Sequence, residues 1–190
     1  MAQPRLNLKN VVALLVDSDR FTRRLVVQMM RGFRMDTPAI RDTGADAKQF
    51  LQQQTVDLIV TEAVLPDMPS SELIRWVRRP EMGSVRFIPV IVLSGYTQLP
   101  TVAAARDAGA NSVLKKPVSP QALFDRILWV ARVPRPFIDS GTYTGPDRRF
   151  KADDPPDQTY KRSDDTPAEC APAEQSSNRL AAAVAKGTSR

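Results

Sequence analysis

Short, continuous apolar runs alternate with amphipathic stretches along the first two thirds of the chain. The run Leu58–Val60 contains no polar residue, a pattern that is typical of a strand buried on both faces of a parallel sheet. Similar runs occupy residues 11–16, 87–94 and 112–115. A weaker run at residues 35–41 is interrupted by a proline, so we expect it to form an edge strand.

Between these runs, apolar residues recur at the spacing of an α-helix. Phe21, Leu25 and Met29 recur every four residues and predict an amphipathic helix that Gly32 closes. The same reasoning predicts helices at residues 45–54, 70–80, 101–108 and 119–131. The residues expected to cap or end these later helices are Ser70 or Ser71, Pro80, Gly109 and Ser119.

This alternation within residues 10–132 predicts an α/β fold, a flavodoxin-like (βα)5 doubly wound parallel sheet with strand order 2-1-3-4-5. Residues 1–9 are interpreted as an N-terminal lead. Residues 133–190 are rich in proline and poor in large apolar side chains, which predicts a mostly disordered tail. Within it the island Tyr-Thr-Gly-Pro-Asp-Arg-Arg, residues 143–149, combines a turn with an aromatic residue and two arginines.

Composition excludes several kinds of function. The 190 residues carry 27 Lys+Arg and 21 Asp+Glu, a mild excess spread along the chain, so we do not expect nucleic-acid binding. No histidine is present, which removes the usual general base and metal ligand. We recognise no nucleophile–base pair and no Gly-rich phosphate loop, and therefore expect no enzyme. The lone Cys170 and the lack of a long apolar run predict a cytoplasmic location without membrane contact.

Candidate chemistry lies at the ends of the predicted strands, where parallel sheets place their sites. The segment Val56–Glu72 resembles the central motif of the receiver domain of two-component response regulators (CheY-like). In that family an apolar strand ends in Asp and is followed by a Leu-Pro-acidic-Met loop and a helix. The loop is present here as Leu-Pro-Asp-Met, residues 65–68, and Glu62 stands at the phosphoacceptor position. Asp17, Ser94 and Lys116 match three further family positions.

The resemblance implies that Asp17 and Glu62 correspond to ligands of Mg²⁺, and that Ser94 and Lys116 correspond to residues that hold phosphoryl oxygens. Ser18 replaces the family's second acidic residue, and Asp19 comes one residue late and is expected to face the first helix. Glu62 is longer than Asp by one methylene, about 1.5 Å, which should impair phosphoryl transfer. In addition, Val113 replaces the aromatic switch residue of the family. We therefore expect a degenerate receiver with Mg²⁺ binding weak or lost and no other cofactor.

Each site residue also has a plainer interpretation. Asp17 would then cap the first helix, and Ser94 would satisfy a backbone group at a strand end. Lys116 would be an ordinary surface lysine, or it would form a fixed structural ion pair with Glu62. In the tail, Arg148 and Arg149 would be solvated charges.

The sequence as a whole predicts a stand-alone receiver protein in phosphorelay signal transduction. We interpret it as a pseudo-receiver that binds a partner protein and in which Glu62 is a fixed mimic of phosphorylated Asp. The expected docking face is residues 101–131, for a histidine kinase, a flagellar, chemotaxis or other signalling protein, or a second copy. Two alternatives stay open: a phosphorylatable receiver of a phosphorelay, and a cyclic-dinucleotide effector that uses Tyr143, Arg148 and Arg149.

Overall fold

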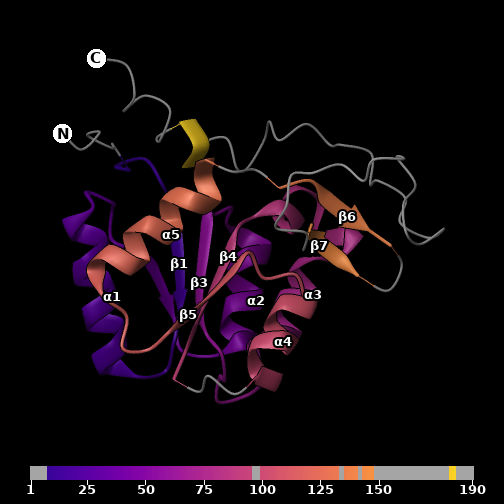
Figure 1. Ribbon diagram of the computed structural model, residues 1–190, viewed down its shortest axis with the longest axis horizontal. Helices are drawn as coiled ribbons and strands as arrows, with labels where there is room; N and C mark the ends of the chain where they lie inside the picture. The colour runs from indigo at the N-terminus through magenta and orange to yellow at the C-terminus, as the bar shows by residue number, and fades with distance from the viewer. Residues whose placement is uncertain (1–7, 96–98, 133–134, 141–142, 148–179, 183–190) are drawn as a thin grey trace.

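A parallel five-stranded sheet runs through the centre of the molecule, with helices on both faces (Figure 1). The computed structural model describes residues 8–95, 99–132, 135–140, 143–147 and 180–182. The strands of the sheet are β1 Ala13–Val16, β2 Ala39–Arg41, β3 Leu58–Glu62, β4 Val90–Ser94 and β5 Ser112–Lys115. Their order is β2-β1-β3-β4-β5, which confirms the predicted topology and leaves the weak second strand at an edge.

The helices form two layers that divide the core. They are α1 Arg20–Gly32, α2 Gly44–Gln53, α3 Ser70–Val77, α4 Leu99–Asp107 and α5 Pro120–Arg132, with a 3₁₀ helix η1 at Pro80–Phe87. Residues of α1 and α5 pack on one face of the sheet with Leu15, Val60 and Leu93. Residues of α2, α3 and α4 pack on the other face with Leu14 and Val92. Neighbouring residues of a strand therefore point into opposite layers, as the period of two requires.

The register aligns the carboxyl ends of the strands. Glu62 lies opposite Leu93, and Ser94 lies opposite Lys115. Val16, the last residue of β1, pairs with Thr61. The residues that follow β1, β3, β4 and β5 therefore emerge at one edge of the sheet, where sites in this fold class lie.

Two predicted helix signals were wrong and two others were confirmed. Ser70 and Ser71 do not cap α3: both lie inside the helix, and the N-cap is Pro69, which makes no side-chain cap bond. The helix also ends at Val77, before Pro80, which instead begins η1. By contrast, Ser119 Oγ accepts the N–H of Ala122 at 3.1 Å at the start of α5. Gly109 has the positive φ of 98° expected after a helix end.

The described part of the tail differs from the expected disorder. Residues 137–139 (β6) and 144–146 (β7) form an antiparallel hairpin, with Ile138 opposite Gly145. Leu180 is fully buried in the core cluster that also contains Leu8 and Val130. The ordered unit therefore reaches beyond the predicted boundaries at residues 10 and 132. Sequence patterns missed the hairpin because each of its strands has only three residues and β7 contains a glycine and a proline, which blur the alternation of a strand.

Among the described residues, we find no helix with the length and apolar character needed to cross a membrane.

Candidate functional site at the carboxyl ends of the strands

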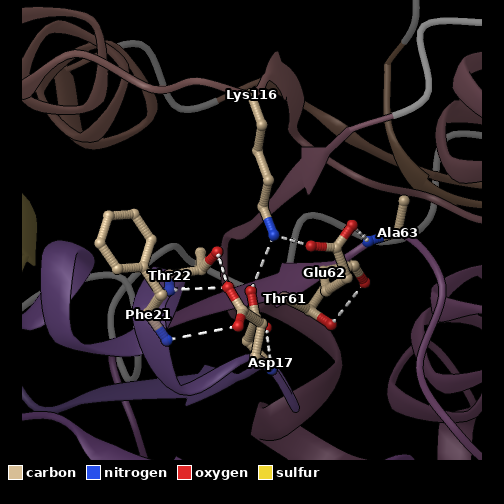
Figure 2. Close-up of polar contacts among 8 residues, drawn as sticks. Asp17, Phe21, Thr22, Thr61, Glu62, Ala63 and Lys116 are labelled. Carbon is tan, nitrogen blue, oxygen red and sulfur yellow. Dashed lines mark hydrogen bonds and ion pairs between the residues drawn. The ribbon is translucent and has the colours of Figure 1, made fainter.

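Asp17 is a buried carboxylate directly after β1. Its side chain is only 1% exposed, and both of its oxygens have partners. Oδ1 accepts the N–H of Asp19 at 2.8 Å, and Oδ2 accepts a hydrogen bond from Lys116 Nζ at 2.9 Å (Figure 2). Asp17 therefore faces the interior of the site. The plainer interpretation, in which Asp17 caps the first helix, was wrong.

Asp19 is the residue that caps α1. Its carboxylate accepts the N–H groups of Phe21 and Thr22 at 3.3 and 2.8 Å, and the hydroxyl of Thr22 at 2.6 Å. The hydrogen bonds from the Thr22 hydroxyl and N–H lower the pKa of Asp19 below its ordinary value. The expectation that Asp19 faces the helix is confirmed. Ser18, between the two acids, is exposed.

Glu62, the last residue of β3, points toward the same space as Asp17. Its Oε2 forms an ion pair with Lys116 Nζ, and its Oε1 accepts the N–H of Ala63 at 3.2 Å (Figure 2). The side chain is 17% exposed, so the pair is largely screened from water. Glu62 therefore has a fixed position, set by one charged partner and one backbone donor.

Lys116 joins the site from the residue after β5. Its backbone N–H donates to the carbonyl of Ser94 at 2.8 Å, which fixes the start of the β5–α5 loop. Its ammonium group lies between the carboxylates of Asp17 and Glu62 (Figure 2). The interpretation of Lys116 as an ordinary surface lysine was therefore wrong. Ser94 itself is fully buried at the end of β4.

Sequence reasoning missed two features of this site. It paired Lys116 with Glu62 but did not predict that the same ammonium also reaches Asp17. It also passed over Thr61, which is fully buried and whose hydroxyl donates to the carbonyl of Glu62 at 3.0 Å. The period of two in β3 places Thr61 on the opposite face from Glu62, so no pattern marked it as a site residue.

The loop after β3 is tied to α2. Asp67 accepts the N–H groups of Gly44 and Ala45, both at 2.8 Å, at the first turn of that helix. Burial by itself raises the pKa of Asp67, but these two N–H groups, the N–H of Asp67 itself and the charge of Lys48 together outweigh it, and the pKa lies below its ordinary value. The acidic residue of the Leu-Pro-Asp-Met loop therefore positions the loop, and its carboxylate is directed at α2.

The donor set does not fit a conventional Mg²⁺ site. Mg²⁺ needs oxygen ligands in octahedral geometry. All four carboxylate oxygens of Asp17 and Glu62 already accept hydrogen bonds or an ion pair, and the Asp19 carboxylate faces the helix. Within the described ranges, no group of three or more His, Cys, Asp or Glu is placed to hold a metal. The cation between the two site carboxylates is the lysine's own ammonium.

The remaining candidates lie elsewhere. Val113, in β5, is half-buried and packs against the core layer of α2, α3 and α4. Tyr143 belongs to the hairpin, where its hydroxyl donates to the carbonyl of Pro146 at 2.6 Å. The hairpin contacts Asn111, ahead of β5, and is therefore at the far end of the sheet from Glu62. Arg148 and Arg149 lie outside the described residues.

Comparison with known proteins agrees with this geometry. The sequence model of the response regulator receiver domain matches residues 13–128. The chain belongs to the response regulator receiver family. This receiver is 28% identical over 114 residues to the chemotaxis protein CheY of Pseudomonas aeruginosa, which covers 60% of this chain and 90% of CheY. It is 27% identical over 144 residues to the response regulator protein PilR of the same organism, covering 76% of this chain but 31% of PilR.

Solved structures share the receiver fold. The chemotaxis response regulator CheY4 of Vibrio cholerae aligns with a TM-score of 0.57 at 22% identity, covering 63% of this chain and 98% of CheY4. The receiver domain of the sensor histidine kinase PA1611 from Pseudomonas aeruginosa, solved with a magnesium ion in its active-site cleft, aligns with a TM-score of 0.56 at 24% identity. That alignment covers 63% of this chain and 94% of the PA1611 domain. The chain therefore shares the fold of these receiver domains.

Proposed function

We propose that this receiver is a pseudo-receiver that acts by binding a partner protein, with Glu62 as a permanent substitute for a phosphorylated Asp. The observation that carries the proposal is the ion pair between Glu62 and Lys116. The Glu62 carboxylate reaches the lysine without a phosphoryl group, and it also accepts the N–H of Ala63. In this proposal the protein catalyses no reaction and needs no Mg²⁺.

Glu62 imitates a phosphorylated Asp only in part, both in its charge and in the length of its side chain. A phosphoryl group adds about −1.5 to −2 charges and three acceptor oxygens, whereas a Glu carboxylate supplies one charge and two oxygens. The extra methylene of Glu moves that charge outward by about 1.5 Å relative to Asp. A single contact of this kind is worth about 1–3 kcal/mol as a bias between two conformations. Glu62 is therefore expected to favour an active-like state without locking it fully.

The proposed docking face is residues 101–131, which comprise most of α4, β5 and most of α5. Lys116 lies in the middle of this segment, and its backbone N–H bonds to Ser94 at the end of β4. A change at the Glu62–Lys116 pair therefore acts on the chain that leads directly into α5. The partner classes are a histidine kinase, a flagellar, chemotaxis or other signalling protein, or a second copy of this chain. The protein is expected to bind its partner in the cytoplasm.

The test compares the wild-type chain with Glu62→Asp and Glu62→Gln by amide NMR and by partner affinity in pull-down. If the proposal holds, both variants shift amide resonances within residues 101–131 and weaken partner binding by about 5- to 100-fold. Glu72→Gln is the matched control, because Glu72 is an exposed carboxylate that pairs with Lys48 away from the site. If both Glu62 variants bind as the wild type does, Glu62 is a structural remnant and the proposal fails.

Treatment of the wild type with acetyl phosphate, followed by intact mass measurement, separates the proposal from a phosphorylatable receiver. The proposal expects no added phosphoryl mass. A stoichiometric gain at Glu62 would favour the phosphorelay alternative. The cyclic-dinucleotide hypothesis stays a prediction, because two of its three residues, Arg148 and Arg149, lie outside the described part of the chain.

A further inference from the structure

Arg78, directly after α3, is a buried guanidinium whose partners are carbonyl groups. It is 2% exposed, and all five of its N–H donors are directed at acceptors. Nε and Nη2 donate to the carbonyl of Gly109 at 3.1 and 2.9 Å, and Nη2 also donates to Asn111 Oδ1 at 3.1 Å. Nη1 donates to the carbonyls of Arg86 and Ile88 at 2.5 and 2.8 Å. No carboxylate is among these acceptors.

Arg78 connects two loops at the end of the sheet where β4 and β5 begin. Arg86 and Ile88 belong to the end of η1 and the lead into β4, whereas Gly109 and Asn111 form the connection between α4 and β5. Asn111 strengthens this connection, because its Oδ1 also accepts the N–H of Val90 at 2.9 Å. The Arg78 guanidinium therefore bridges η1 and the α4–β5 loop through hydrogen bonds.

The hairpin packs against the Arg78 guanidinium from the η1 side. The ring of Phe137 lies 5.4 Å from the Arg78 guanidinium carbon and meets Phe87 edge-on, with ring centroids 4.8 Å apart. Asp139 forms an ion pair with Arg86 at 2.6 Å. Figure 1 shows the orange hairpin packed beyond one end of α3, separate from the helices α1 and α5.

The hairpin also grips the α4–β5 loop. Arg135 donates to the carbonyl of Asn111 at 2.6 Å and to that of Asp147 at 2.9 Å, so it joins both ends of the hairpin segment to the loop. Backbones meet at Gly145, where an added Cβ would lie 2.7 Å from the Cα of Gly109. Only a residue without a side chain permits this approach. The Thr-Gly-Pro of the tail island is therefore a packing surface.

Arg78 carries a buried charge without a carboxylate partner. Removal of Arg78 from water lowers the pKa of its guanidinium to about 10. An ion that is buried without an opposite charge is expensive even when all of its donors are satisfied. The ring of Phe137 covers this guanidinium from the hairpin, so the hairpin packs against a charge that is costly to bury.

We propose that residues 135–140 and 143–147 form a clamp that holds the α4–β5 loop against η1 over Arg78, and that opening of this clamp releases α4 and the start of β5. The clamp lies beyond the stretch that matches the receiver family, which ends at residue 128. It does not depend on the role proposed for Glu62. In this proposal the conformation of the segment after α5 is coupled to that of the receiver domain, because displacement of the hairpin also displaces α4.

The test is amide hydrogen exchange of the full-length chain, followed peptide by peptide. Gly145→Ala places a methyl group against the backbone of Gly109 and should open the clamp. Exchange in residues 99–111 and in the hairpin should then accelerate by about tenfold or more, while α1 stays within about twofold of the wild type. Gly32→Ala is the matched control, because a Cβ there meets no atom within 4 Å, and it should leave residues 99–111 unchanged.

A second variant, Asp139→Asn, removes the ion pair with Arg86 but adds no bulk, so it answers the question if Gly145→Ala unfolds the whole chain. The proposal expects the same pattern with a smaller change. Acceleration confined to residues 135–147 in both variants would overturn it, because the hairpin would then open without effect on α4. Equal acceleration in every segment in both variants would also overturn it, since the hairpin would then unfold only with the whole domain.

Discussion

Lys116, the residue after β5, donates a hydrogen bond to Asp17, the residue after β1, across the two strands that separate β5 from β1 in the sheet. The same ammonium group pairs with Glu62 at the end of β3. One cation therefore balances two carboxylates, of which Asp17 is almost fully buried. Because an unpaired buried carboxylate is costly, this lysine supports the fold as well as the site.

Replacement of Lys116 by Met should destabilise the protein. The substitution leaves the Asp17 carboxylate buried without its cation, and we expect the free energy of unfolding to fall by about 2–4 kcal/mol at neutral pH. Urea denaturation followed by circular dichroism measures the change. The control is Lys48→Met, which removes an exposed pair with Glu72 and should cost less than about 1 kcal/mol. Equal losses for the two variants would contradict the structural role of Lys116.

Replacement of Lys116 by Met should strengthen the binding of Mg²⁺, although it weakens the fold. In the wild type the ammonium group occupies the space between the carboxylates, and we expect no saturation by Mg²⁺ below about 1 mM. In Lys116→Met the carboxylates of Asp17 and Glu62 lose that cation, and at 10 mM MgCl₂ the thermal midpoint should rise by about 2–4 °C more than in the wild type. NMR titration and thermal melts with and without the salt decide the matter. Saturation of the wild type at submillimolar Mg²⁺ would refute the expectation.

The sheet was predictable because its signal is local and strong. Runs such as Leu58–Val60 have no polar residue, and Ser119 and Gly109 mark ends of helices by their own chemistry. That Asp17, Glu62 and Lys116 emerge at the same edge of the sheet followed from one rule, that parallel strands end at a common edge. Resemblance to a family then supplied the roles that periodicity alone does not contain.

The rest depended on contacts between distant segments. The reach of Lys116 to Asp17 spans 99 residues of sequence and depends on the path of a long side chain. Arg78 precedes another arginine, and in the sequence this pair is typical of surface charges. The acceptors of Arg78 are backbone carbonyls, which no sequence pattern indicates. Leu180 stands alone in an alanine-rich stretch, and only its burial identifies it as part of the core.

The acid side of the stability curve should depend on Asp67. The pKa of this carboxyl is lower in the folded chain than the ordinary 3.8, so Asp67 stabilises the fold above about pH 4, and this contribution is lost as pH falls further. In Asp67→Asn the free energy of unfolding should therefore decline less steeply below about pH 4 than in the wild type. Denaturation at a series of pH values between 2 and 7 measures the slopes. Identical slopes would mean that the bonds to Gly44 and Ala45 favour neither protonation state.

Leu180 should contribute measurably to stability, although it lies in the tail. Its side chain is fully buried in the same cluster as Leu8 and Val130, and Leu180→Ala should reduce the free energy of unfolding by about 2–3 kcal/mol. Leu25→Ala is the matched control, since Leu25 is 40% exposed and should lose less than about 1 kcal/mol. Removal of residues 134–190 should lower the midpoint further, because it also removes the hairpin. A truncated chain as stable as the wild type would contradict both expectations.

Arg78 provides the sharpest test of the far end of the sheet. Arg78→Met keeps much of the aliphatic volume but withdraws every donor from the carbonyls of Gly109, Arg86 and Ile88. Buried acceptors without a partner cost about 1–3 kcal/mol each, whereas removal of a buried charge relieves its desolvation. We expect the first effect to exceed the second, because several acceptors are stranded by one change, and the free energy of unfolding should fall by about 3 kcal/mol.

Two companion variants separate the hydrogen bonds from the charge. Arg78→Lys keeps the charge but not the planar fork, so it should recover less than half of the loss. Arg79→Met, at the next and exposed position, should change stability by less than about 0.5 kcal/mol. If Arg78→Met were as stable as the wild type, the gain from removing a buried charge would equal the loss of five hydrogen bonds. The hydrogen bonds of Arg78 between η1 and the α4–β5 loop would then be dispensable for stability, and the hairpin would hold the loop through Arg135 and Gly145 alone.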